Sequence, residues 1–252
     1  MNKARVFPVA AGLAVLIATA GCASEPAVPV DDAGFGKRVH DYLLANPEVV
    51  AEANQALQAK QQAAQREQTR QALAKNRDGL FADGTDPMVG NPSGDITVVE
   101  FFDNECPYCK KLAPDLAKLA AADPGVRVVY KEFPILGPGS TTAAKAALAA
   151  ARQGKYAAFH DALMADHTPE HQLALPRILE IANALDIDTT RLQADMEAPE
   201  IGAKIAANIA LARALGITGT PGLIIGDKVM PGAVPYQVMA DAVAQVRKES
   251  HP

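Results

Sequence analysis

Residues 96–109 read ITVVEFFDNECPYC, and this stretch decides the fold. Its first seven residues form a short run rich in β-branched and aromatic side chains, which is typical of a buried strand. Two cysteines, Cys106 and Cys109, follow that run, and the residues from Pro107 to Ala122 have the apolar spacing of an amphipathic helix. We therefore expect both cysteines to lie where a buried strand gives way to a helix.

That location predicts different roles for the two cysteines. A thiolate at a helix N-terminus faces unpaired backbone N–H groups and the positive end of the helix dipole, so its pKa falls. Pro107 suits the first helical turn because it lacks an N–H group that would be unpaired there. We interpret Cys106 as the exposed nucleophile and Cys109, one turn further along, as the resolving thiol that attacks a mixed disulfide.

Other interpretations of the pair are weaker. A zinc site needs about four ligands, and the sequence has three cysteines and no second CxxC. A purely structural disulfide would close so short a loop that it would stabilise little. Three histidines lie at helical spacings, namely His160, His167 and His171, but Thr168-Pro169 interrupts any single helix there. We expect surface histidines, no metal and no cofactor.

The chain after this motif predicts an α/β protein. Val126–Phe133 resembles a second strand, so that strand, helix and strand form a right-handed parallel unit. Residues 140–215 are almost wholly helical in pattern, with breaks that divide them into three or four helices. Gly222–Ile225 and Lys228–Met230 then predict a hairpin around a Gly-Asp turn, and Pro235–Lys248 a closing helix.

Two motifs resemble a known family. Val99-Glu100-Phe101-Phe102 followed by Cys106-Pro107-Tyr108-Cys109-Lys110 resembles the active-site strand and helix of DsbA-like proteins. Thr220-Pro221, placed before a strand, is similar to the cis-proline loop of the thioredoxin superfamily. The resemblance covers roughly residues 87–246. It implies a thioredoxin fold with an inserted helical domain, no metal, and dithiol–disulfide exchange with exported proteins.

The resemblance also implies roles for single residues. Glu100 matches the buried acid that accepts a proton from the resolving thiol, although an acid in this strand could instead be partly exposed. An ionisable group in a buried strand is costly, which favours the functional interpretation. Pro107 and Tyr108 match the active-site motif. Thr220 and Pro221 match the loop whose backbone pairs with the substrate chain; without the resemblance, a trans turn would be the default.

Three residues depart from the strongest oxidases of the family. Tyr108 replaces the His that is common between the cysteines there, and the charge of Glu105 should oppose a thiolate on Cys106. Thr220 before the proline resembles the disulfide isomerases. Oxidation and isomerisation of exported proteins therefore both stay open, with a membrane redox partner expected to reset the disulfide.

The first residues predict export. Lys3 and Arg5 precede an apolar run too short to span a membrane, as in a signal peptide. Cleavage after Ala20 would release a soluble periplasmic protein. Alternatively, Thr19-Ala20-Gly21-Cys22 resembles a lipobox, which would make Cys22 a lipidated anchor in the outer membrane. The odd cysteine count favours the lipoprotein, because a soluble form would carry an unpaired thiol into an oxidising compartment.

A long segment lies between the signal and the catalytic domain. Asn46-Pro47 indicates a helix start, and residues 49–77 contain no Gly and no Pro. Their apolar stripe is thin, so this helix is either solvated or an oligomerisation stalk. It resembles the arm of the oligomeric proteins linked to copper tolerance. The predicted organisation is a signal peptide (1–21), a tether (22–34), a helical arm (35–80), and a DsbA-like domain (81–252) with a helical insertion at about 140–215.

Composition narrows the function classes. The formal net charge of −5 and the lack of a Lys/Arg cluster argue against a nucleic-acid partner. The leading hypothesis is an enzyme, a protein thiol:disulfide oxidoreductase. The alternative is an envelope lipoprotein with a thioredoxin-like fold and a structural or adhesive role. Insulin reduction by the purified domain would separate the two.

Overall fold

The computed structural model describes residues 32–81 and 84–250. The predicted signal peptide, Cys22 and most of the tether lie outside the described residues. The chain divides into two compact units, Met1–Leu57 and Gln58–Pro252. Among the described residues, no helix has both the length and the apolar character needed to cross a membrane.

The described part of the first unit is helical. Helix α1 (Asp32–Ala45) begins three residues before the predicted arm, and α2 (Glu48–Lys75) starts directly after Asn46-Pro47, as predicted. The Asn46 amide donates to the Tyr42 carbonyl at 2.8 Å, which satisfies a carbonyl at the end of α1. Large apolar side chains on α1 are exposed, among them Phe35, Val39 and Tyr42.

Helix α2 continues into the second unit and ends at Lys75 rather than at Arg77. Asn76 interrupts it, because its side-chain amide competes for the Ala72 carbonyl at 2.8 Å. The short helix α3 (Arg77–Phe81) follows. Leu73 of α2 and Leu80 of α3 are buried against the sheet, so the end of the predicted arm belongs to the core of the second unit.

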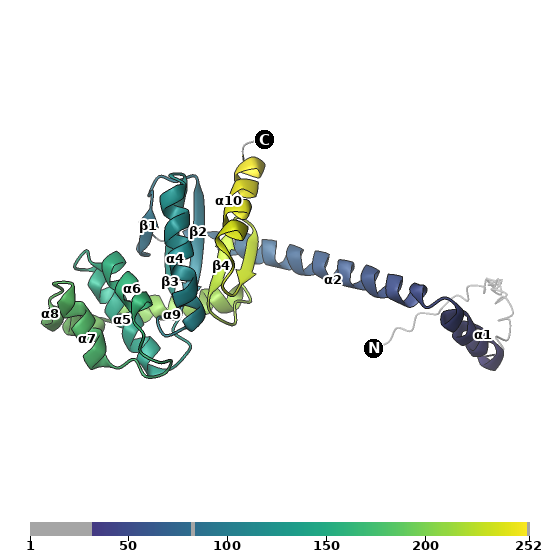
Figure 1. Ribbon diagram of the computed structural model, residues 1–252, viewed down its shortest axis with the longest axis horizontal. Coiled ribbons are helices and arrows are strands. Elements are labelled where there is room, and N and C mark those ends of the chain that lie inside the picture. The colour runs from purple at the N-terminus through teal and green to yellow at the C-terminus, as the bar shows by residue number, and fades with distance from the viewer. Residues whose placement is uncertain (1–31, 82–83, 251–252) are drawn as a thin grey trace, which may run out of the picture. The chain divides into compact units, whose positions relative to one another are not determined.

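A five-stranded sheet organises the second unit, in the order β1-β3-β2-β4-β5 (Figure 1). Strands β2 and β3 are parallel, and the other neighbours are antiparallel. This confirms the predicted parallel unit and hairpin. The short strand β1 was not predicted, since its sequence is rich in turn residues and it forms only by pairing with β3. The strands are β1 (Met88–Gly90), β2 (Ile96–Phe102), β3 (Val126–Glu132), β4 (Gly222–Ile225) and β5 (Lys228–Pro231).

The helical insertion lies between β3 and β4 and contains five helices, where three or four were predicted. The extra break lies before α8, where Asp186 has a φ of 54° and Asp188 caps the new helix by accepting from the Arg191 N–H. The helices are α5 (Pro138–Ala151), α6 (Tyr156–Ala165), α7 (Leu175–Ala184), α8 (Thr189–Met196) and α9 (Pro199–Ala214).

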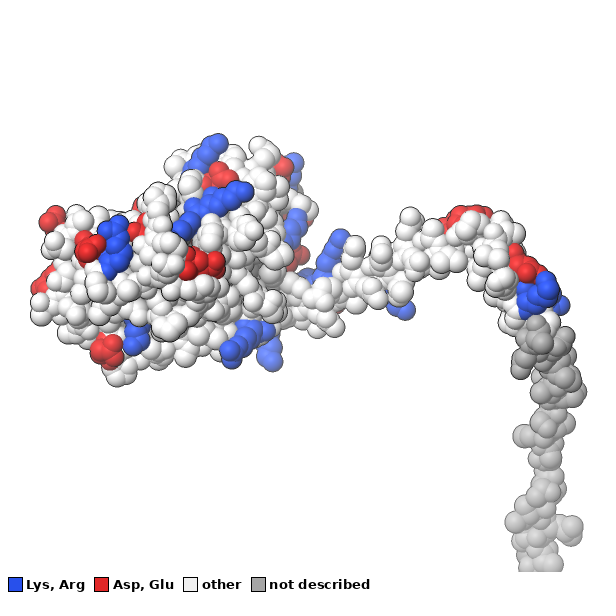
Figure 2. All heavy atoms as spheres, turned by 60° about the horizontal axis from the view of Figure 1, so that its bottom comes forward, with Lys and Arg blue, Asp and Glu red and all other residues white. Residues whose placement is uncertain are grey.

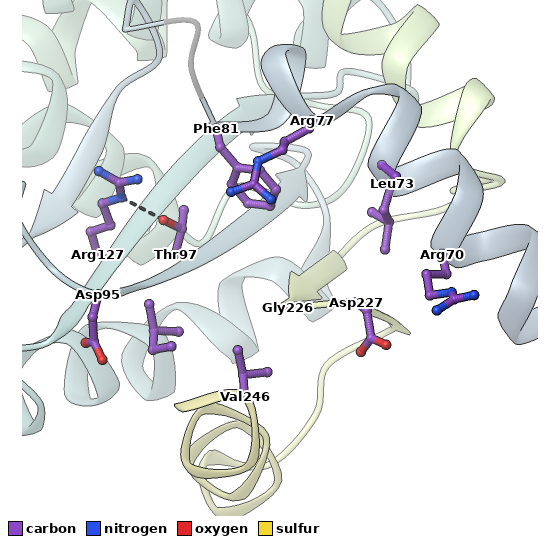
Figure 3. A pocket seen from close by; sticks show the side chains of 12 residues that line it. Arg70, Leu73, Arg77, Phe81, Asp95, Thr97, Arg127, Gly226, Asp227 and Val246 are labelled. Carbon is purple, nitrogen blue, oxygen red and sulfur yellow. Dashed lines mark hydrogen bonds between the residues drawn. The ribbon is translucent and has the colours of Figure 1, made fainter. Parts of the chain in front are cut away.

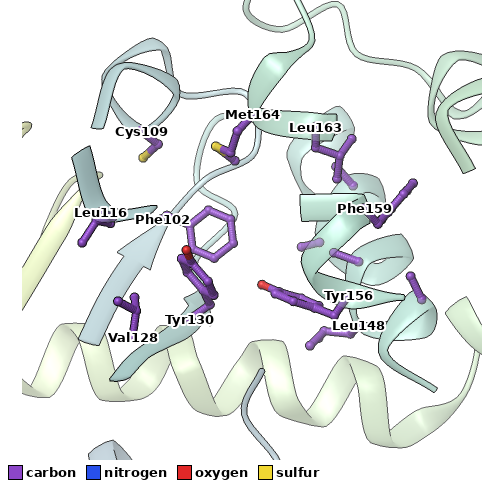
Figure 4. Packing of buried hydrophobic residues seen from close by; sticks show 14 of the residues in the cluster. Phe102, Cys109, Leu116, Val128, Tyr130, Leu148, Tyr156, Phe159, Leu163 and Met164 are labelled. Atoms are coloured by element: carbon purple, nitrogen blue, oxygen red, sulfur yellow. The ribbon is translucent and has the colours of Figure 1, made fainter. Parts of the chain in front are cut away.

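Alternate residues of β2 and β3 face opposite sides of the sheet. One side packs against α4 (Pro107–Ala122) and α10 (Tyr236–Ser250). Its core continues into the insertion, where Tyr130 faces Tyr156 with ring centroids 6.1 Å apart (Figure 4). The other side packs against the end of α2, α3 and α9. On the face of the second unit seen in Figure 2, basic and acidic side chains are interspersed.

Candidate active site

The two cysteines lie at the start of α4, directly beyond the end of β2. Cys106 is the N-cap residue of α4 and Pro107 occupies the first helical turn, as the sequence predicted. Both thiols are free. Cys109 is fully buried, and Cys106 is only 4% exposed, so the expectation of an exposed nucleophile is wrong in degree. The Thr220 carbonyl lies 3.4 Å from the Cys106 Sγ and helps to enclose it, whereas Tyr108 is exposed.

The two thiols differ sharply in acidity. The pKa of Cys106 falls to about 6, chiefly because the Cys109 thiol donates a hydrogen bond to it. The Thr220 side chain and the backbone N–H groups of Cys109 and Tyr108 lower this pKa further, against the opposing effect of burial. Burial raises the pKa of Cys109 strongly, followed in size by its hydrogen bond to Cys106. The pair therefore combines a ready thiolate with a thiol that keeps its proton.

Glu100 is buried on β2, on the side of the sheet that packs against α4. Burial raises its pKa to about 8, and the charge of Cys106 adds to that shift. The carboxyl group can therefore hold or release a proton near neutral pH, next to a thiol pair whose reaction moves a proton.

The Thr220–Pro221 peptide bond is cis, which is the geometry that the resemblance implies. Pro221 directly precedes β4, and β4 pairs antiparallel with β2. A cavity of about 190 Å³ adjoins this loop and is lined by residues 217–222 and part of β5. The cis-proline loop thus lies beside the nucleophile and borders a space of side-chain size.

Three consecutive polar residues, Asp103, Asn104 and Glu105, precede the nucleophile and are all buried. Asp103 accepts from the N–H groups of Ile135 and Leu136, at 2.7 and 3.0 Å. The Asn104 amide donates to Glu132 on β3 at 2.8 Å. Sequence reasoning missed these anchors, although three adjacent polar residues beside a buried strand were a usable signal.

Glu105 makes side-chain contacts that the sequence did not indicate. Its carboxylate accepts from the Leu173 N–H at 2.9 Å and from the Ser140 hydroxyl at 3.0 Å. The carboxylate is therefore bound by donors of the helical insertion.

Comparison with known proteins decides the family. Residues 97–244 match the model of the DSBA-like thioredoxin domain, and this range includes both cysteines and the cis-proline. The chain belongs to this family. Residues 31–64 also match the N-terminal domain of the copper resistance protein ScsC. The DsbA-like thioredoxin fold, with its helical insertion and its arm, is thereby confirmed.

Solved structures agree with this assignment. A thioredoxin-like oxidoreductase from Silicibacter pomeroyi is 51% identical, with a TM-score of 0.66, and the match covers 69% of this chain and 98% of that one. ScsC from Proteus mirabilis, in a transitional conformation, is 32% identical with a TM-score of 0.66, over 86% and 97%. The thiol-disulfide exchange protein alpha-DsbA2 from Wolbachia pipientis is 32% identical with a TM-score of 0.68, over 73% and 98%.

Curated relatives include a different kind of protein. The chain is 31% identical over 161 residues to the Na(+)/H(+) antiporter NhaA 3 of Salinispora tropica. That match covers 63% of this chain and 24% of the antiporter. The chain thus spans about a quarter of the length of the curated relatives that it matches.

The three histidines at helical spacing, His160, His167 and His171, differ in burial. His160 is buried between Phe102 and Tyr130, with ring centroids 4.9 and 4.2 Å away, and burial lowers its pKa to about 4. The expectation of a surface histidine is wrong here, because α6 packs its inner face onto the sheet. His167 and His171 are exposed. Among the described residues, no cluster of three or more His, Cys, Asp or Glu could hold a metal ion.

A second cavity lies at the other end of the sheet, where β2 begins (Figure 3). It measures about 400 Å³ and is lined by the ends of α2 and α3 and by the β4–β5 turn. Two of the charged residues that line it form ion pairs: Asp95 binds Arg247 at 2.7 Å, and Arg70 binds Glu67 at 2.6 Å. This cavity is separate from the thiol pair.

Proposed function

We propose that this chain catalyses thiol–disulfide exchange on cysteines of exported proteins through Cys106 and Cys109. The observation that carries the proposal is the acidic Cys106 thiol at the N-terminus of α4, held beside a buried Cys109 that keeps its proton. A thiolate of this kind is both a nucleophile and a good leaving group. Family membership and the names of the solved relatives support the same chemistry.

The same pair of thiols can oxidise a client or isomerise its disulfides. When the protein oxidises a client, a client thiolate attacks the Cys106 sulfur, a mixed disulfide forms, and Cys109 leaves and takes up a proton. A second client thiolate then attacks the client sulfur, so the client gains a disulfide and Cys106 leaves as a thiolate. When the protein isomerises a client, the Cys106 thiolate attacks first, and Cys109 resolves a stalled mixed disulfide.

Glu100 fits the role of proton carrier in this cycle. It gives up a proton when Cys109 must be protonated and takes one when Cys109 must attack, because its raised pKa lies near neutral pH. Thr220 and Pro221 present their backbone to the client chain beside Cys106. The cavity that adjoins them accommodates a client side chain.

Trapping tests the assignment of the two thiols. Cys106→Ala should abolish exchange, whereas Cys109→Ala should accumulate mixed disulfides with clients, because the nucleophile survives without its resolver. Non-reducing gels of both variants, with Lys111→Ala on the exposed side of α4 as a control, measure this. Exchange retained by Cys106→Ala would reverse the roles.

The arm supports a further part of the proposal, that residues 35–80 join several catalytic domains and favour isomerisation. Linked domains raise the local thiol concentration around a misfolded client. The match of residues 31–64 to the ScsC N-terminal domain and the exposed apolar side chains of α1 support this. Light scattering of the purified protein should give an oligomer that is lost on deletion of the residues before Gln58, where the second unit begins. This deletion keeps Leu73 and Leu80, which belong to the core of the second unit. A monomeric full-length chain would contradict the proposal.

The remaining parts of the proposal concern location. We place the protein in the periplasm, with residues 1–21 as a signal peptide and Cys22 as a lipid anchor in the outer membrane. The catalytic domain of residues 81–252 then meets clients and a membrane redox partner that resets the disulfide. Mass spectrometry of the mature N-terminus should find diacylglycerol on Cys22, and a free Gly21 start would refute the anchor.

A further inference from the structure

Glu105, the residue before the nucleophile, is bound to the helical insertion through its side chain. One oxygen accepts from the backbone N–H of Leu173, in the segment before α7. The other accepts from the hydroxyl of Ser140, in the first turn of α5. Glu105 itself is 2% exposed. A buried carboxylate with two such donors is a strong and directional attachment.

We propose that Glu105 is a positioning residue that holds Cys106 in its reactive geometry by fixing the active-site loop to the helical insertion. This inference rests on the proposed nucleophile and names a residue that the thiol pair does not include. The insertion would then serve the chemistry directly, as the support on which the loop is fixed.

The geometry of Cys106 is sensitive to such support. Its Sγ receives a hydrogen bond from the Cys109 thiol and faces the backbone N–H groups of the first turn of α4. It also lies 3.4 Å from the Thr220 carbonyl, on a loop that is 114 residues away in the sequence. Hydrogen bonds weaken steeply when donor and acceptor move out of line. Because Glu105 is joined to Cys106 by one peptide bond, a displaced Glu105 displaces the thiol.

The insertion is built to receive this carboxylate. Ser140 lies at the N-terminal end of α5, where the helix dipole favours a negative charge. The neighbouring Gly139 has no side chain, and a Cβ there would lie 2.8 Å from the Glu105 Oε2 and 2.3 Å from the Leu173 carbonyl oxygen. A glycine is therefore required for the three segments to approach one another.

Two substitutions at one position separate anchoring from charge. Glu105→Gln keeps both contacts, because its amide oxygen accepts from the Leu173 N–H and its NH₂ donates to the Ser140 hydroxyl. Glu105→Ala loses both contacts and the charge. The readout is the rate of alkylation of Cys106 by iodoacetamide against pH, in the reduced full-length protein, with thermal unfolding as a record of stability.

If the contacts of Glu105 position Cys106, Cys106 in Glu105→Gln should be alkylated at the same rate as in the unaltered protein. Glu105→Ala should react about three- to tenfold more slowly at pH 6, with its profile shifted to higher pH, since fewer donors reach the thiolate. An unchanged profile in Glu105→Ala would overturn the proposal. A profile shifted to lower pH in both variants would also overturn it, because the carboxylate would then act as an opposing charge.

Ser140→Ala and Gly139→Ala provide a second route if Glu105→Ala fails to fold. Ser140→Ala removes one donor and should give a smaller shift in the same direction, while Gly139→Ala should displace the carboxylate. Unchanged profiles in both would overturn the proposal. Alkylation needs no client protein, so failure of the proposed exchange activity would be seen separately, in the trapping experiment.

Discussion

The two sides of strands β2 and β3 differ in how their buried ionisable side chains are paired. On the side that packs against α4, Glu100 and Glu132 are buried, and burial raises the pKa of both. The donors to Glu132 are neutral, the Tyr156 hydroxyl at 3.0 Å and the Asn104 amide. On the other side, Lys131 is equally buried but forms an ion pair with Asp86 and donates to the Gly79 carbonyl. Lys204 also pairs with Asp86, at 2.6 Å.

The ion pair of Lys131 and Asp86 is a structural feature, whereas the buried acids can take part in chemistry. A buried ion pair keeps its groups charged and connects segments, here the α3 region and the residues before β1 to the sheet. A buried acid without a cation stays close to its neutral form and can exchange a proton near neutral pH. Only the side with the acids packs against α4, which carries Cys109, and the proposed reaction exchanges a proton there.

Breaking the ion pair of Lys131 and Asp86 should have the larger effect on stability. Asp86→Ala breaks the buried ion pair with Lys131 and should lower the free energy of unfolding by about 3–5 kcal/mol. The pKa of Cys106 should not change. Chemical denaturation together with the alkylation profile measures both quantities. Asp227→Ala, at an exposed acid on the β4–β5 turn, is the control and should change stability by less than about 0.5 kcal/mol.

A shift in the pKa of Cys106 in Asp86→Ala would show that the two sides are not independent. The ion pair would then influence the thiol chemistry and would not be purely structural, whatever the loss of stability.

Replacing Glu100 on the opposite side of the sheet should have a smaller effect on stability, and this effect should depend on pH. The folded-state pKa of Glu100 is raised from 4.5 to about 8, so its ionisation opposes folding. The penalty begins as pH rises through the unfolded value and is complete above the folded one. Glu100→Gln removes it and should therefore stabilise the reduced protein, by about 1 kcal/mol at pH 5 and about 3 kcal/mol at pH 7.

Urea denaturation of the reduced protein at the two pH values measures this difference, with the exposed Glu52→Gln as a matched control. A stabilisation that does not grow with pH would mean that Glu100 is already ionised in the folded state. The distinction between the two sides would then be lost.

Local sequence pattern predicted the parts of the fold that depend on neighbours in the chain. The strand of residues 96–102 and the helix of residues 107–122 have the bounds expected of them, because apolar periodicity and Pro107 specify them directly. The short strand β1 was missed because it exists only through pairing, with Met88 opposite Val129.

The candidate site was predictable in its chemistry but not in its support. The spacing of Cys106 and Cys109 and the buried position of Glu100 follow from one strand–helix junction. The contact between Glu105 and Leu173 joins residues 68 positions apart, and no local pattern encodes it. The burial of His160 likewise depends on how α6 packs against the sheet. Tertiary contacts determine the surroundings of Glu105 and His160, and a local sequence pattern does not show them.

We propose that Cys106 is a nucleophile whose thiolate forms near neutral pH. The most direct test is a pH titration of thiolate ultraviolet absorbance in the reduced full-length protein, with Cys106→Ala measured in parallel to isolate this thiol. The difference in absorbance between the two proteins should be half complete at about pH 6. A difference that appears only around the ordinary thiol pKa of about 8.5 would contradict it.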